Sequence, residues 1–172
     1  MIPLDRKEKI QARSAITGFL RKEKEKQIAQ KLQPYIQGKV AAYQPISGEV
    51  NILEYFSDIC FYFPHTSKTD LTFYQDTQEK IKGAFGVEEP LPTHKIEPKD
   101  LDVIIVPVVG FQGCKRIGYG AGYYDRYLKE TQALKIGIAF DCQEMDEIIW
   151  HEGDVELDRM ITESRIIERE ER

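Results

Sequence analysis

The sequence predicts an α/β protein with three layers, α/β/α, in which a mostly parallel, Rossmann-like sheet follows an amino-terminal helical arm. Apolar residues recur at helical spacing through residues 4–35, whereas residues 102–109 and 133–140 are short, continuous apolar runs typical of strands buried on both faces. Helical and strand-like segments alternate along the chain, which indicates a parallel sheet covered by helices on both sides. With 172 residues, the chain is expected to form a single domain, 1–172.

The amino-terminal arm is predicted to contain two helices. Its apolar residues at roughly helical spacing are Ile10, Ile16, Phe19, Leu20, Ile28 and Leu32. Thr17 and Gly18 are expected to divide the arm, and Gly38 follows it as a stop signal.

A β-α-β unit is predicted next. Residues 39–46 indicate a strand, residues 47–56 a capped turn into a short helix, and residues 59–64 a second strand. Residues 71–75 are a candidate for a shorter strand.

The second half of the chain is predicted to supply the centre of the sheet. Residues 103–109 indicate a central strand, residues 123–131 a helix, residues 133–140 another buried strand, and residues 159–167 one more. Residues 111–122 would then form the loop that leaves the carboxyl end of the central strand. Ligands of such sheets bind beyond the carboxyl ends of the strands, so this loop is expected to be a pocket wall.

Charge and cysteine content exclude several function classes. The chain has 24 basic and 29 acidic residues, a net charge of −5, which argues against general binding of nucleic acid or of an anionic membrane. Three widely spaced cysteines predict neither a disulfide framework nor a zinc site. Without a signal peptide or a membrane-length apolar run, we expect a soluble, cytoplasmic protein that is a monomer.

The stretch RIGYGAGYYDR, residues 116–126, is the strongest candidate for a binding site. Gly118, Gly120 and Gly122 permit positive φ, so that backbone N–H groups can converge on an anion, for which phosphate is the natural candidate. Arg116 can pair with phosphate oxygens, and Asp125 can hold a metal. The spacing matches neither the dinucleotide-binding nor the Walker pattern, and a glycine-rich turn alone is often only a tight turn.

The same stretch, read with the residues before it, resembles the signature of the 5-formyltetrahydrofolate cyclo-ligase family, also called methenyltetrahydrofolate synthetase. IIVPVVGFQGCKRIGYGAGYYDRYL is similar to the family core P-x-x-x-F followed by R-L-G-x-G-x-G-Y-Y-D-R. Further similar segments are YQPISGEV, GVEEP, FDCQ, the ending DVELDRMITESRII, and RSAIT after Arg6. The resemblance therefore covers most of the chain.

The resemblance implies an α/β/α fold and an activity. Members of the family convert 5-formyltetrahydrofolate and ATP into 5,10-methenyltetrahydrofolate, ADP and phosphate, with magnesium, through phosphorylation of the formyl oxygen. Phosphoryl transfer depends mainly on positioning and charge stabilisation, which suits a site of glycine amides and basic side chains.

The resemblance also implies roles for individual residues. Arg116, Tyr123 and Asp125 would be catalytic, and Asp125 and Asp154 would hold Mg²⁺. Glu49 would bind the folate pterin together with the loop residues Gly120, Ala121, Gly122 and Tyr123. The expected ATP-binding residues are Arg6, Arg116, Ile117, Gly118, Tyr119, Gly120, Ala121, Gly122, Tyr123 and Tyr124.

Structural roles remain open for the same residues. Glu49 follows a Ser-Gly turn and is compatible with an ordinary acid in the first turn of a helix. Asp125 is compatible with a helix start, and Asp154 with a turn after Gly153. The sequence also departs from the family pattern at Ile2, Gln112 and Gly153. A non-catalytic nucleotide- or folate-binding relative is therefore the alternative hypothesis.

Overall fold

The structure is a computed structural model, and it describes residues 4–67, 70–83 and 86–170. Within these residues the two predicted amino-terminal helices are present, α1 (Leu4–Ser14) and α2 (Gly18–Leu32). They are separated where the sequence predicted, because Gly18 adopts a φ of 61° that interrupts regular helix geometry. Short 3₁₀ helices follow at Gln33–Tyr35, Leu53–Phe56, Pro98–Asp100 and Asp141–Gln143.

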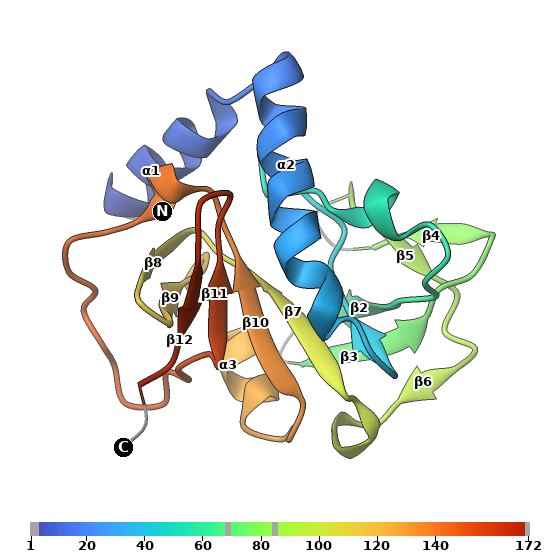
Figure 1. The fold of residues 1–172 in the computed structure, drawn as a ribbon. Coiled ribbons are helices and arrows are strands. Elements are labelled where there is room, and N and C mark those ends of the chain that lie inside the picture. The colour runs from blue at the N-terminus through green and yellow to red at the C-terminus, as the bar shows by residue number, and fades with distance from the viewer. Residues whose placement is uncertain (1–3, 68–69, 84–85, 171–172) are drawn as a thin grey trace.

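An eight-stranded sheet forms the centre of the described residues (Figure 1). Its strands are β1 (Val40–Ala41), β2 (Tyr62–Thr66), β3 (Leu71–Gln75), β6 (Lys95–Ile96), β7 (Val103–Pro107), β10 (Leu134–Ile138), β11 (Arg159–Ile161) and β12 (Ile166–Glu168). Their order across the sheet is β12-β11-β10-β7-β1-β2-β3-β6. The neighbours from β11 to β2 pair in parallel, and β12, β3 and β6 pair antiparallel, which confirms the predicted mostly parallel sheet.

Helices cover both faces of the sheet, as the sequence predicted. Ile28 and Leu32 of α2 pack with Ile105 of β7 in one core cluster. Leu128 of α3 (Tyr123–Leu128) packs with Ile104, the neighbour of Ile105, in the cluster on the opposite face. Figure 1 shows α2 in front of the sheet and α3 behind it. The alternating side chains of one buried strand thus supply both cores.

The arm helix α1 lies across the carboxyl ends of the central strands. Lys9 donates hydrogen bonds to the carbonyls of Cys142 and Glu144, beyond β10, and Arg13 donates to the carbonyl of Val108, beyond β7. This placement brings the arm to the edge of the sheet where a ligand was expected.

Three predicted strands were wrong in extent. The strand expected at residues 59–64 is β2, which begins three residues later, at Tyr62, and ends at Thr66. The strand expected at residues 39–46 ends at Ala41, with one further bond from the amide of Ala42 to Tyr62, and Pro45 soon removes a backbone donor. The single strand expected at residues 159–167 is a hairpin of β11 and β12. Its turn is fixed by Thr162, whose hydroxyl accepts hydrogen bonds from the amides of Ser164 and Arg165.

The loop expected at residues 111–122 is also partly wrong, because its first half is a hairpin. Strand β8 (Gly110–Gln112) pairs antiparallel with β9 (Lys115–Ile117) around Gly113, which has a φ of 58°. A second hairpin, β4 (Lys80–Lys82) with β5 (Glu88–Pro90), was not predicted. Among the described residues, no helix combines the length and apolar character that crossing a bilayer requires.

Candidate active site

A cavity of about 870 Å³ lies at the carboxyl ends of β1, β2 and β7. After β1 the chain continues to β2 on one side, whereas β7, β10 and β11 follow one another on the other side. The cavity therefore lies at the point where the strand order reverses, which is the usual position of a ligand in an open α/β sheet. The predicted site residues that line it are Arg6, Glu49, Arg116, Ile117, Gly118, Tyr119, Gly120, Ala121, Gly122, Tyr123, Tyr124, Asp125 and Asp154.

The glycine loop, residues 118–122, joins β9 to α3 and forms one wall. Gly120 and Gly122 have φ values of 104° and 76°, so both use the left-handed freedom that was predicted. Gly118 differs, because its φ is not positive. A Cβ on Gly118 would approach Nη2 of Arg116 to 2.7 Å, so this glycine makes room for the guanidinium.

Arg116 is the buried cation of this wall, with a relative exposure of 8%. Its Nε donates to the carbonyl of Pro107, and its guanidinium carbon lies 5.6 Å from the ring centre of Tyr124. Burial lowers the pKa of Arg116, while the negative charge of Asp125 opposes this shift. The side chain is therefore held as a desolvated positive charge beside the glycine loop, an arrangement suited to an anion.

Arg6 reaches the same loop from α1. Its Nε donates to the carbonyl of Gly118 at 2.7 Å. The tyrosines of the loop and helix take different positions. Tyr123 donates through its hydroxyl to the carbonyl of Ser67. Tyr124 is partly buried and packs against Arg116, where desolvation raises the pKa of its hydroxyl.

The fold brings Asp125 and Asp154 to one rim of the cavity. Oδ1 of Asp125 accepts a hydrogen bond from the amide of Val155, the residue after Asp154. Oδ2 of Asp154 accepts one from the amide of His151. Both carboxylates line the cavity, and the described residues give no hydrogen bond to their remaining oxygens. Asp154 thus does stabilise a turn after Gly153, whereas Asp125, in the first turn of α3, bonds a neighbouring segment and does not cap its own helix. Each of these bonds engages only one carboxylate oxygen.

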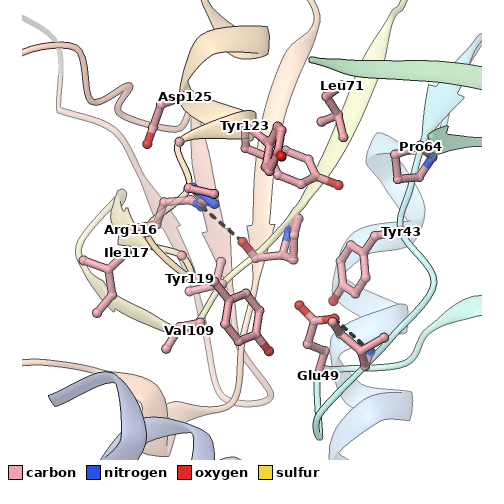
Figure 2. A pocket seen from close by; sticks show the side chains of 18 of the residues that line it. Tyr43, Glu49, Pro64, Leu71, Val109, Arg116, Ile117, Tyr119, Tyr123 and Asp125 are labelled. Atoms are coloured by element: carbon pink, nitrogen blue, oxygen red, sulfur yellow. Dashed lines mark hydrogen bonds between the residues drawn. The ribbon is translucent and has the colours of Figure 1, made fainter. Parts of the chain in front are cut away.

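Glu49 lies on the opposite wall, as Figure 2 shows. It follows a tight turn in which Ser47 has a φ of 48° and Gly48 a φ of 79°. The amide of Ile46 donates to Oε1 of Glu49 at 2.8 Å. Glu49 is 6% exposed, and burial raises its pKa to about 7, although the bond from Ile46 and the charges of Arg13 and Arg116 act in the opposite direction. Glu49 does not begin a helix, because the next helical turn starts at Leu53.

Sequence reasoning missed two groups at this site. Tyr43, inside the motif YQPISGEV, lines the cavity and donates its hydroxyl to the carbonyl of Val50. Arg13, inside RSAIT, is completely buried behind the cavity. Both belong to segments that resemble the family, which was the available signal. Nothing in the local sequence shows that an arginine in a charged helix is buried.

The departures from the family pattern have partial explanations. Gln112 donates through Nε2 to the carbonyl of Asp146 and accepts from the amide of Ile148, so it anchors the segment that leads to Asp154. Gly153 has a φ of 96°, which suits the turn before Asp154. Ile2 lies outside the described residues.

Fold and site together define a class of protein. It is an α/β protein with its ligand pocket at the switch point of a parallel sheet, where a glycine loop and a buried arginine face a buried carboxylate. A profile described as the 5-formyltetrahydrofolate cyclo-ligase family matches residues 4–163, so the chain belongs to that family.

Individual relatives agree with this assignment. The chain is 32% identical to a 5-formyltetrahydrofolate cyclo-ligase of Mycoplasma pneumoniae, over 92% of this chain and 96% of the relative. It is 34% identical to the enzyme of the same name from Escherichia coli K12, over 55% of this chain and 56% of that protein.

Two solved structures share the fold. The NMR structure of a 5,10-methenyltetrahydrofolate synthetase from Aquifex aeolicus superimposes with a TM-score of 0.86 at 29% identity, covering 98% of this chain and 93% of that one. The structure of a 5,10-methenyltetrahydrofolate synthetase from Mycoplasma pneumoniae superimposes with a TM-score of 0.77 at 30% identity. The match covers 92% of this chain and 96% of that one. Since these relatives are named for a catalysed reaction, they favour the catalytic hypothesis over a binding-only relative.

Proposed function

We propose that this protein is an ATP-dependent enzyme that cyclises 5-formyltetrahydrofolate to 5,10-methenyltetrahydrofolate with release of ADP and phosphate. The observation that carries the proposal is the cavity itself. It places a glycine loop and a desolvated arginine opposite a buried carboxylate, within a chain that belongs to the cyclo-ligase family. One wall suits the phosphates of ATP, and the other suits the hydrogen-bond donors of a pterin ring.

The proposed reaction has two steps, phosphorylation of the formyl oxygen and closure of the ring. The formyl oxygen attacks the terminal phosphorus of ATP, an O–P bond forms, and the bond to ADP breaks. The neighbouring anilino nitrogen then attacks the formyl carbon. As the C–N bond forms, that nitrogen loses its proton, the C–O bond breaks, and phosphate departs with the former formyl oxygen and the proton. No enzyme nucleophile is required, so positioning and charge stabilisation carry the catalysis.

The phosphate wall is assigned to the glycine loop and its arginines. Backbone N–H groups of residues 118–122 and the side chain of Arg116 would bind the ATP phosphates and stabilise the charge of the transferred group. Arg6 lies against the loop through its bond to Gly118 and would complete this wall. Tyr123, at the first turn of α3, would contact both ATP and the folate.

The folate wall is assigned to Glu49. An ionised carboxylate in a desolvated position accepts strong hydrogen bonds from the N–H groups of a pterin. Because its pKa is raised to about 7, Glu49 is only partly ionised at neutral pH before the substrate arrives, and donors on the pterin would favour the ionised form.

Magnesium fits the remaining pair of carboxylates. The described residues contain no group of three or more His, Cys, Asp or Glu side chains placed to hold a metal. Mg²⁺ commonly takes one or two carboxylates and completes its shell with phosphate oxygens and waters, which Asp125 and Asp154 at the cavity rim would allow. When bound, the ion would neutralise charge on the ATP phosphates.

The proposal includes the setting of the enzyme. We place it in the cytoplasm as a monomer, with residues 1–172 forming one domain and without nucleic-acid or membrane partners. The near-balanced charge supports the absence of nucleic-acid and membrane partners, and the family profile over residues 4–163 supports a single domain.

The test is a turnover assay with purified protein, 5-formyltetrahydrofolate, ATP and Mg²⁺. We expect methenyl absorbance to appear only when the protein, the folate, ATP and Mg²⁺ are all present, with one ADP released per methenyl product. A protein that binds both ligands yet forms no methenyl product would instead support the non-catalytic relative.

A further inference from the structure

Arg13 is a completely buried arginine whose guanidinium contacts three separate segments around the cavity. Its Nε donates to the carbonyl of Ser47 at 3.0 Å, and its Nη1 donates to the carbonyl of Val108 at 3.0 Å. Its Nη2 donates to the hydroxyl of Tyr119. One side chain of α1 therefore joins the turn before Glu49, the end of β7 and the glycine loop.

Anchoring the helix does not require a charge at this position. Within the described residues Arg13 makes no salt bridge, and its partners are two carbonyls and a hydroxyl. A buried charge without an ion-pair partner carries a large desolvation cost. The negative group on which its charge acts is the carboxylate of Glu49.

On the folate side, Arg13 holds a turn that has an unfavourable backbone. Ser47 adopts positive φ without being a glycine, and a Cβ on Gly48 would approach Oγ of Ser14 to 2.5 Å. Such a conformation persists only where its surroundings fix it. Arg13 fixes the carbonyl of Ser47, and Arg21 fixes the carbonyls of Gly48 and Glu49.

On the phosphate side, Arg13 holds Tyr119 between two glycines. Gly118 and Gly120 give this part of the loop the greatest backbone freedom available to a chain. Tyr119 lines the cavity and is 38% exposed, and its hydroxyl accepts the bond from Arg13. This contact limits where the backbone amides on either side of Tyr119 can point.

We propose that Arg13 is a positioning residue for the cyclisation, which sets the Glu49 turn and the glycine loop in register so that the two substrates meet in reacting geometry. The inference rests on the proposed function and extends it to a side chain that lines neither substrate wall. Because Arg13 acts on both walls, its removal should impair the use of both substrates, unlike removal of Glu49, which is assigned to the folate alone.

Electrostatics provide a readout that a purely structural role would not change. The charged and titratable groups that act on Glu49 are Arg13 on α1, Arg116 on β9, Tyr43 after β1 and Tyr124 on α3, and Arg21 on α2 binds its carbonyl. Arg13 and Arg116 favour the ionised carboxylate. Replacing Arg13 by a neutral residue should therefore raise the pKa of Glu49 further.

The first experiment is an NMR titration of the Glu49 carboxyl in the ligand-free protein. We expect Arg13→Met to shift its midpoint to higher pH and Arg13→Lys, which retains the charge, to leave it near the wild-type value. Arg165→Met is the matched control, because it removes a half-exposed arginine that pairs with Glu144 away from the cavity. An unchanged midpoint in Arg13→Met would overturn the electrostatic half of the inference.

The second experiment is a double-mutant cycle of Arg13→Lys and Tyr119→Phe in the turnover assay. Lysine cannot reproduce the three bonds of the guanidinium, so Arg13→Lys should raise KM for both substrates. Tyr119→Phe removes one hydrogen bond and should raise KM for ATP roughly two- to tenfold, with little effect on KM for the folate.

The two changes should be non-additive on KM for ATP, since both break the same contact. Additive effects would mean that Tyr119 acts on ATP independently, which overturns the proposed coupling. The NMR titration uses no substrate, so it tests the effect of Arg13 on Glu49 even if the wild-type protein shows no turnover. A wild-type protein without turnover would count against the proposed function and not against the role of Arg13. Tyr119 is exposed and its change to phenylalanine is conservative, so the Tyr119→Phe protein should fold. Its KM for ATP therefore still tests the contact if the Arg13 variants do not fold.

Discussion

Glu49 shows how a residue with a proposed binding role can lower the stability of the protein. Burial raises its pKa from 4.5 to about 7, so folding disfavours its ionised form. The folded state then binds more protons than the unfolded state between these two values. Stability is therefore lost as pH rises from 4.5 through about 7, and the full cost is present above that range.

We predict that Glu49→Gln stabilises the protein at neutral and higher pH. Glutamine keeps an acceptor for the amide of Ile46 but carries no charge. The gain in the free energy of unfolding should reach about 3 kcal/mol above neutral pH and should vanish in acid. Urea unfolding of both proteins across pH measures it. A gain that does not depend on pH would show that desolvation of the carboxylate is not its cause.

The same substitution should damage the use of the folate. Losing a charge-assisted hydrogen bond to the pterin should raise KM for 5-formyltetrahydrofolate roughly ten- to a hundredfold, while KM for ATP changes little. Steady-state kinetics with each substrate varied in turn decides this. Equal effects on both would point to a structural residue.

Individual site residues could be predicted where they belong to a sequence motif. For these residues the fold only had to bring the motifs close together. Arg116, Asp125 and Glu49 were expected at one cavity, and all three line it. Arg13 was not predictable, because its role depends on burial by segments near residues 47, 108 and 119, which only the folded chain assembles.

Among the structural elements, the glycine loop illustrates two different uses of glycine. Gly118 provides space for Arg116, whereas Gly120 provides a backbone conformation, since a Cβ there would meet nothing within 4 Å. A substitution at Gly120 therefore tests backbone geometry without adding a collision.

We predict that Gly120→Val weakens ATP binding by roughly ten- to a hundredfold, because the loop must leave its positive φ to accept a β-branched residue. Gly113→Val is the matched control. Gly113 also has positive φ and open space around its Cβ position, but it turns the β8–β9 hairpin and does not line the cavity. Calorimetry with a non-hydrolysable ATP analogue compares the two. Equal affinity in both variants would contradict the assigned phosphate wall.

Elements were predictable to the degree that their signal is local. Both arm helices, β3 and the buried strands β7 and β10 have strong apolar patterns and were found close to their observed bounds. Hairpin β4–β5 was missed because its strands read KIK and EEP, polar triplets without strand periodicity. The 3₁₀ helix at Leu53–Phe56 was expected as an α-helix, since one helical turn has no period to distinguish the two.

At the scale of the whole molecule, the metal assignment depends on the topology of the sheet. Asp125 and Asp154 are separated along the chain by β10, yet Asp125 bonds the amide next to Asp154. The sequence could anticipate this meeting only by assuming that parallel strands end at one edge, and the observed contact agrees with that assumption.

We predict that Asp125→Asn and Asp154→Asn each raise the Mg²⁺ concentration needed for half-maximal turnover. Asparagine can still accept the hydrogen bond that each aspartate now accepts, but it removes a charge that favours the buried Arg116 cation, so thermal stability without nucleotide should fall modestly. Asp146→Asn, an exposed change on the same segment as Asp154, is the control. Mg²⁺ titrations of turnover provide the measurement, and an unchanged requirement in both variants would remove these residues from the metal site.

The central claim is that the cavity holds the formyl group of the folate against the terminal phosphate of ATP. The most direct test places ¹⁸O in the formyl oxygen of 5-formyltetrahydrofolate and follows the label during a complete turnover. Phosphorylation of that oxygen predicts that the label leaves in inorganic phosphate, one atom for each methenyl product. Label recovered in water, with unlabelled phosphate released, would contradict the account.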